Sequence, residues 1–288
     1  MTTIKALLAV VLLGSSGFSM AYDFKCVHEK DTAPPLDQQA DQWFKQARVL
    51  SKKRPADWSK VASLYQQAVE KNHWKAMHNL AELYLRGDGV VKDTNKAIDL
   101  YLEMIKLQAP LGYYDMSVMT KRGVGVVQSD RQSVIYLLKA GDVGNPIAQV
   151  RLGNIYIYEV KKRDLGVSYL RCAAEQNDAS ANYELATYYE ILDRNYPVAM
   201  HYYQRSAALG YVKGALSIEN TFRKGDFGYP ENIKIATDYG HIYDRLSDNP
   251  ELRFPEIAKD HPLPPHPVQG YHADKDINWK PTGRDDDY

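Results

Sequence analysis

Apolar and small residues recur along this chain every 33 to 36 positions, in the same order each time. One column holds large residues: Leu64, Leu100, Tyr136, Tyr169 and Tyr202. Twelve positions later a column holds small residues: Ala76, Gly112, Ala148, Ala181 and Gly214. Sixteen positions after the first column the residues are aliphatic: Leu80, Met116, Leu152, Leu185 and Ile218. A period of this length predicts a stack of helix hairpins, and therefore an all-α fold.

Polar residues and glycines mark the ends of the expected helices. Asp57, Asp93 and Ser129 are spaced 36 residues apart, and each carries a side chain that caps helix N-termini. Gly87 and Gly123 suit the left-handed position that closes the first helix of a hairpin. The expected ends of the second helices are Asn72, Gly144, Asn177 and Gly210.

The small column predicts that neighbouring helices approach closely, because no long side chain separates them there. Tyrosine occupies several of the large columns, so we interpret most of the 22 tyrosines as packing residues.

The pattern divides the chain into four regions: a signal peptide at 1–21, a polar arm at 22–35, the repeat array at 36–247 and a Pro-rich extension with an acidic end at 248–288. Lys5 precedes the apolar run Ala6–Leu13, and Ser19-Met20-Ala21 fits the cleavage rule of exported proteins. The run is shorter than the roughly 20 residues that span a bilayer. We therefore expect a periplasmic mature chain that begins near Tyr22. The alternative is a retained N-terminal anchor helix.

Charge and motifs exclude several kinds of function. Lysine and arginine total 36, as do aspartate and glutamate, so the chain lacks the basic surplus of proteins that bind nucleic acid or anionic membranes. Gly87-x-Gly89 follows an expected helix and not a strand, which argues against a dinucleotide site. His73 and His78 are five residues apart and do not share a helix face as metal ligands do. We expect solvated histidines, no cofactor, no metal and no catalysis.

Two cysteines, Cys26 and Cys172, belong to a chain that we expect in an oxidising compartment. Cys172 shares a column with Gln67, Glu103, Lys139 and Arg205. These long polar residues predict that the column faces solvent. Cys172 is then available to pair with Cys26 in the arm, although the arm has a limited reach; a disulfide and two free thiols both remain open.

A varied set of residues occupies positions of the first helices that packing does not use: His78, Asn79, Glu82, Tyr114, Asp115, Arg151, Asn154, Tyr183, Glu184 and Thr187. In curled helical stacks this face is concave and binds partners. Tyrosine and arginine are residue types that dominate binding energy at interfaces. We interpret the set as a protein-binding face; the alternative is an ordinary solvated surface.

The repeat Ala76…Leu80-Ala81…Tyr84…Gly87-Asp88-Gly89-Val90…Asp93…Lys96-Ala97…Tyr101 resembles the Sel1-like repeat, a relative of the tetratricopeptide repeat. The resemblance covers roughly 40–246, and in the fourth and fifth units the Gly-x-Gly loop is lost or shortened. It implies a right-handed superhelical solenoid of about six antiparallel hairpins. It also implies a protein-binding function.

The layout of an exported array with a Pro-rich tail is similar to that of a group of Gram-negative envelope proteins. Some of them are immunity partners of type VI secretion effectors, notably of phospholipase D type. This resemblance implies a non-enzymatic inhibitor of a secreted effector; the alternatives are an envelope adaptor for signalling or cell-wall assembly, and a hydrolase built on the tail. The acidic end, Asp285-Asp286-Asp287, is either a mimic of substrate phosphate in the partner's cleft or a solubilising end.

Overall fold

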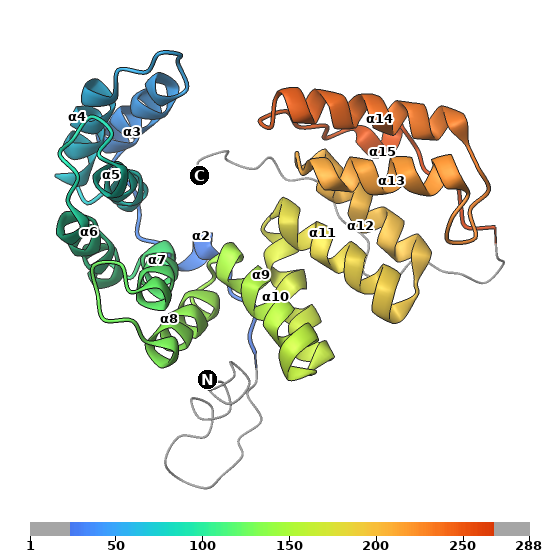
Figure 1. Cartoon of the computed structure of the whole chain (residues 1–288), viewed down its shortest axis with the longest axis horizontal. Helices are drawn as coiled ribbons and strands as arrows, with labels where there is room; N and C mark the ends of the chain where they lie inside the picture. Colours follow the sequence, from blue (N-terminus) through green and yellow to red (C-terminus); the bar gives the residue numbers. More distant parts are fainter. Residues whose placement is uncertain (1–23, 268–288) are drawn as a thin grey trace, which may run out of the picture. The chain divides into compact units, whose positions relative to one another are not determined.

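A computed structural model describes residues 24–267, and every regular element among them is a helix (Figure 1). The elements are α2 (Glu29–Thr32), α3 (Gln38–Ser51), α4 (Trp58–Val69), α5 (Trp74–Arg86), α6 (Thr94–Lys106), α7 (Pro110–Arg122), α8 (Asp130–Asp142), α9 (Pro146–Asn154), η1 (Ile155–Val160), α10 (Arg163–Glu175), α11 (Ala179–Tyr188), η2 (Tyr189–Asp193), α12 (Tyr196–Ala208), α13 (Val212–Lys224), α14 (Ile233–Asp248) and α15 (Ile257–Asp260). The expected all-α array of hairpins is confirmed. The expected signal peptide and the acidic end lie outside the described residues.

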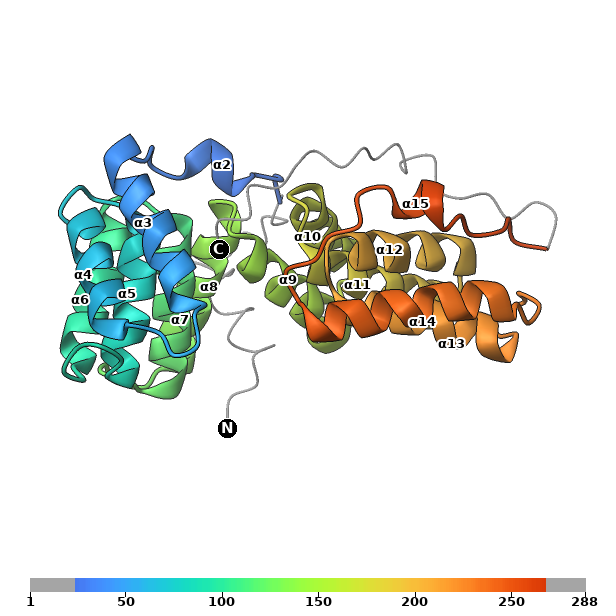
Figure 2. The same ribbon diagram turned by 90° about the horizontal axis from the view of Figure 1, so that it is seen from above.

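The chain forms two compact units, which meet in the sequence between Leu152 and Gly153. In the first unit, α3, α5 and α7 form one layer, and α4, α6 and α8 form the other (Figures 1 and 2). In the second unit, each helix from α10 to α14 packs against the next one in the chain. No helix within residues 24–267 is both long enough and apolar enough to cross a membrane.

The helices begin where the capping residues predict. The Asp57 carboxylate accepts a hydrogen bond from the Lys60 amide at 3.0 Å, Asp93 caps α6 in the same way, and the Ser129 hydroxyl caps α8. Each bond satisfies an amide that the helix itself leaves without a partner. Gly87 and Gly123 end α5 and α7 with φ of +84° and +67°, a region that glycine enters without strain.

The small column allows the close helix contacts that it predicts. Ala76, Ala148 and Ala181 are fully buried. A Cβ atom added to Gly112 would lie 2.6 Å from the Cβ of Met104, inside the normal contact distance. Neighbouring helices thus pack backbone to backbone at this position, which fixes the spacing of successive hairpins.

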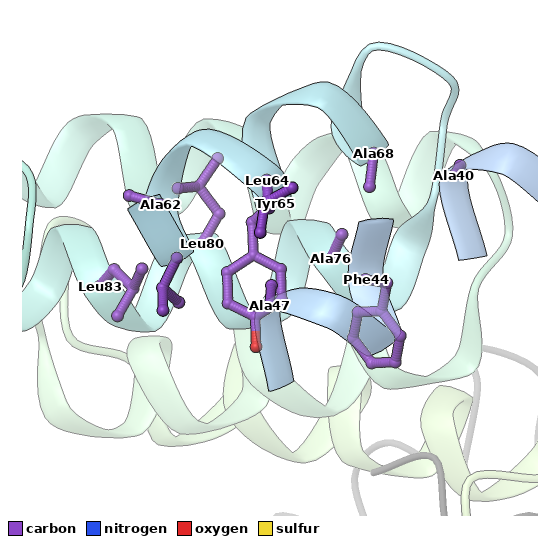
Figure 3. Close-up of a cluster of buried hydrophobic side chains, with 11 residues drawn as sticks. Ala40, Phe44, Ala47, Ala62, Leu64, Tyr65, Ala68, Ala76, Leu80 and Leu83 are labelled. Atoms are coloured by element: carbon purple, nitrogen blue, oxygen red, sulfur yellow. The ribbon is translucent and has the colours of Figure 1, made fainter. Parts of the chain in front are cut away.

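The core of the first unit begins with a cluster from α3, α4 and α5 (Figure 3). Phe44 is 1% exposed, and its ring stacks on that of His73 with centroids 4.7 Å apart. Tyr65 packs beside it, with ring centroids 6.0 Å apart. Full burial of one such large apolar side chain contributes about 1.5–3 kcal/mol, so clusters of this kind hold successive hairpins together.

Tyrosines pack in stacked pairs in the second unit, as the repeat predicts. Tyr156 and Tyr169 stack with centroids 5.6 Å apart, and Tyr189 and Tyr202 stack with centroids 5.7 Å apart. The two pairs are one 33-residue repeat apart in sequence. All four side chains are buried, which confirms their interpretation as packing residues.

The hairpins that lack the Gly-x-Gly loop end their first helix in a wider turn. Helix α9 continues into the π-helical segment η1, and α11 continues into η2. Lys161 and Arg194 follow with φ of +65° and +57°, and take the place of glycine. This shorter connection accounts for the change of period from 36 to 33 residues.

The arm and the start of the extension are ordered against their own units. Glu29 of α2 is buried, and its carboxylate accepts a hydrogen bond from the Asn145 side chain at 3.0 Å. A single helical turn, α2, therefore lies within the expected polar arm. In the second unit, the His261 carbonyl accepts hydrogen bonds from Tyr239 and Gln204, and the Phe254 amide donates to Ala208.

Two expectations about polar residues are wrong. Cys172 is 1% exposed and does not face solvent. Arg205, one repeat later in the same column, is also buried and donates a hydrogen bond to the Ala174 carbonyl, so the polar members of a column do not keep it in solvent. His73 is not solvated either: it is fully buried, and its Nδ1 atom accepts a hydrogen bond from the Ala76 amide as the cap of α5.

Candidate protein-binding face

The ten residues of the expected face lie on the first helices of the hairpins, on α5, α7, α9 and α11. Nine of them are half-buried, which places their side chains at the boundary between core and solvent. Asp115 is the exception, because it is only 6% exposed. The expectation that packing leaves its position unused is therefore wrong for Asp115.

In the first unit, His78 of α5 and Asp115 of α7 form an ion pair, with Nδ1 and Oδ2 2.8 Å apart. The two residues are one repeat plus one position apart in sequence. Burial raises the pKa of the Asp115 carboxyl above its usual value, and the imidazole opposes this only in part. Burial also lowers the pKa of His78, but the Asp115 carboxylate outweighs it and raises that pKa overall. The pair thus ties two neighbouring hairpins together at the face.

Two further face residues are held by tyrosines from the second helices. The Tyr101 hydroxyl donates to Glu82 at 2.8 Å, and Asn79 donates to the Tyr65 hydroxyl at 3.1 Å. Glu82 also pairs with Arg86, one turn further along α5. These bonds orient the face side chains before any partner arrives, which reduces the entropy that binding costs. Tyr114 and Arg151 complete the first unit's set, both half-buried.

In the second unit, the Tyr183 ring contacts Tyr203 and Tyr211, with centroids 5.5 Å and 5.2 Å away. Lys213 lies over the same ring at 5.9 Å from its centroid. Thr187 donates a hydrogen bond to the Tyr183 carbonyl one turn earlier. An aromatic side chain held on two sides is a rigid contact group, which is the character of interface hot spots.

Glu184 and Asn154 form the polar part of the second unit's set. Burial raises the pKa of the Glu184 carboxyl, while a hydrogen bond from Asn154 and the charge of Lys213 oppose the shift. Glu184 in turn helps to raise the pKa of the nearby Tyr158 phenol, after burial. A half-buried carboxylate with few balancing charges favours a polar or cationic group from a partner.

Sequence reasoning missed the residues that support the face. They are the second-helix tyrosines Tyr65, Tyr101 and Tyr203, together with Tyr211 and Lys213 at the start of α13. A signal existed in the repeat, since Tyr65, Tyr101 and Tyr203 each follow the first column of large residues by one position. Hydroxyls, amides and paired charges suit recognition of another protein surface. Cys26 and Cys172 are both disulfide-bonded, so neither offers a thiolate to a metal ion.

Comparison with known proteins agrees with this architecture. The family model described as Sel1 repeat matches residues 74–108, 110–145, 146–178 and 179–211. Among solved structures, the immunity protein PA5088 of Pseudomonas aeruginosa is 45% identical with a TM-score of 0.77, over 87% of this chain and 97% of that one. The immunity protein Pa5087 of Pseudomonas aeruginosa is 43% identical with a TM-score of 0.73, over 86% and 97% of the respective chains.

Curated relatives match only part of this chain. The chitin synthase regulator SKT5 of Saccharomyces cerevisiae is 27% identical over 186 residues, which are 59% of this chain and 26% of that protein. The chain thus spans about a quarter of the length of this much larger regulator.

Proposed function

We propose that this chain, which belongs to the Sel1 repeat family, is an immunity protein that binds and inhibits a phospholipase-type effector of a type VI secretion system. The likeness to PA5088 carries the proposal, because it extends over 97% of a protein named for immunity. The pre-ordered polar and aromatic face supports it, since such a face suits recognition of a folded protein.

The proposal places inhibition at the surface of the array and not in any catalysis by the chain. In the first unit, Tyr114 and Arg151 would contact the effector together with His78, Asn79 and Glu82, while the buried Asp115 would hold His78 in place. In the second unit, Tyr183 would act as a rigid anchor beside Asn154, Glu184 and Thr187. The acidic end, Asp285–Asp287, would add a contact by imitating the substrate phosphate.

The proposal also includes the four regions expected from the sequence and a periplasmic location. Residues 1–21 would export the protein to the periplasm, with an arm at 22–35, the array at 36–247 and the extension at 248–288. A fusion of residues 1–21 to alkaline phosphatase tests export: activity requires a periplasmic enzyme, so an inactive fusion would count against this location.

Protection of a sensitive bacterium tests the function. A phospholipase-type effector of a type VI secretion system is sent to the periplasm of a host, with or without the full chain. We expect growth only in the presence of the chain. Deletion of residues 284–288 should weaken protection if the acidic end imitates substrate, and growth that stops despite the full chain would reject the immunity function.

Two matched variants test the face within the same assay. Tyr114→Ala removes a proposed contact, whereas Tyr113→Ala removes the preceding tyrosine of α7, which points about 100° away around the helix. We expect about tenfold weaker binding for Tyr114→Ala only. Equal effects of the two variants would remove Tyr114 from the interface.

A second candidate function is an adaptor in the assembly of the cell envelope. One observation favours it: a curated relative is named as a chitin synthase regulator. An adaptor would recover a wall-synthesis enzyme in a pull-down from the periplasm. It would give no protection against the effector.

A further inference from the structure

A hollow of about 260 Å³ opens in the first unit, between the end of α3, the start of α4 and the face side of α5. Asn79 and Glu82 of the expected face lie in its wall, although the hollow was not apparent from the repeat pattern. Its volume is below the roughly 300–1,000 Å³ of sites for drug-sized ligands. A single side chain from another protein suits this space better.

Positive charge surrounds the hollow. Its lining includes three cations, Arg48, Lys52 and Arg86, and one acidic residue, Glu82. The Arg86 guanidinium pairs with Glu82 at 3.5 Å and with Asp88, just outside the lining, at 2.7 Å. The exposed cations Lys53 and Arg54 follow directly in the loop after α3. The chain as a whole has no net charge, so this is a local excess. Such an excess steers and holds an anionic group.

The inner wall offers hydrogen-bonding groups of neutral residues. Figure 3 shows Tyr65 within the apolar cluster. Its hydroxyl accepts a hydrogen bond from Asn79 at 3.1 Å. Ser51 and Trp58 also line the hollow. Burial raises the pKa of the Tyr65 phenol, while the charges of Arg48 and Arg86 oppose the shift.

We propose that this hollow binds a carboxylate side chain, an aspartate or a glutamate, on the surface of the inhibited effector. The inference rests on the proposed function and adds the chemistry of one contact to it. Arginine binds a carboxylate through two parallel hydrogen bonds. Lys52 adds a further positive charge, and Ser51 and Tyr65 line the same hollow.

Charge reversal at the rim tests the contact in the full mature chain, with the phospholipase-type effector as the probe. Lys52 and Arg86 are exposed, so Lys52→Glu and Arg86→Glu should leave the fold intact, which circular dichroism verifies. The matched control is Lys106→Glu, which makes the same change on an exposed lysine of α6 that does not line the hollow. Calorimetry should give at least about tenfold weaker binding for the two rim variants and native affinity for the control.

A substitution that removes negative charge from the lining should have the opposite effect on binding. Glu82→Gln removes the single acidic residue of the lining and keeps an acceptor for the Tyr101 hydroxyl. We expect severalfold tighter binding, because the hollow becomes more positive. In addition, replacement of the contacted acid of the effector by lysine should restore binding to Arg86→Glu.

Each outcome bears on a definite claim. If the native chain binds the effector and the rim variants bind it equally well, the carboxylate site is wrong and the proposed function stands. If the native chain does not bind the effector at all, the proposed function fails and this inference fails with it. If the native chain instead sediments with phosphatidylglycerol vesicles and the rim variants do not, the hollow serves a lipid surface and the proposal is overturned.

Discussion

Removal of the Phe44 ring should loosen the first hairpins and spare the later ones. Phe44 is 1% exposed, stacks on His73 and lies within the cluster from α3, α4 and α5. Truncation of such a phenylalanine to alanine costs about 3–5 kcal/mol, through lost burial and the cavity that remains. In a repeat array this loss of stability affects mainly the hairpins next to the substituted residue.

Hydrogen exchange measured by mass spectrometry resolves this distribution. In Phe44→Ala, amides of α3, α4 and α5 should exchange ~10²–10⁴-fold faster, which corresponds to the same free energy. Amides of α7 and α8 should change far less. The control is Val49→Ala on the same helix, where the side chain is 62% exposed and truncation should shift stability by less than about 0.5 kcal/mol.

A uniform rise in exchange across α3 to α8 would refute the reasoning. It would mean that the first unit unfolds as one cooperative globule, in which a cavity at one end weakens every helix equally. Exchange rates in α3 to α5 that match those of the native protein would also refute the reasoning, because the cluster would then contribute little to stability.

Three other outcomes are expected. The pKa of His78 is raised, so the folded protein holds this proton more tightly than the unfolded chain does, and its stability falls as pH rises above about 6.5. The raised pKa of the Asp115 carboxyl adds a fall in stability that begins above about pH 4. Urea titrations of Asp115→Asn should lose both declines, and an unchanged slope would contradict the pairing. Gly112→Leu should lower the free energy of unfolding by at least about 1–3 kcal/mol through overpacking against Met104, and native stability would disprove the close contact. Thiol titration of the unreduced, denatured chain should find no free thiol from Cys26 or Cys172.

The local features of the fold could be predicted from the sequence. The caps Asp57, Asp93 and Ser129 act within three residues of their partners, so no distant part of the chain changes their role. The small column at Ala76 and Gly112 was equally clear, because close packing tolerates few residue types and the repeat samples the same position several times.

Features that depend on one particular neighbour could not be predicted in this way. Cys172 is buried although the other residues of its column are polar. The residue types at this position in the other repeats do not determine which side chains surround Cys172 in its own repeat. Asp115 is buried because His78 of the adjacent hairpin supplies a charge at 2.8 Å, a partner that is one position out of register. The π-helical ends η1 and η2 were visible only as a shortened loop.

The most direct test of the account is a titration of the effector's phospholipase activity with the purified mature chain, residues 22–288. A protein that occludes the enzyme through its array should abolish hydrolysis at one molecule of chain per molecule of effector. Activity that persists when the chain is in micromolar excess would contradict the proposed immunity function.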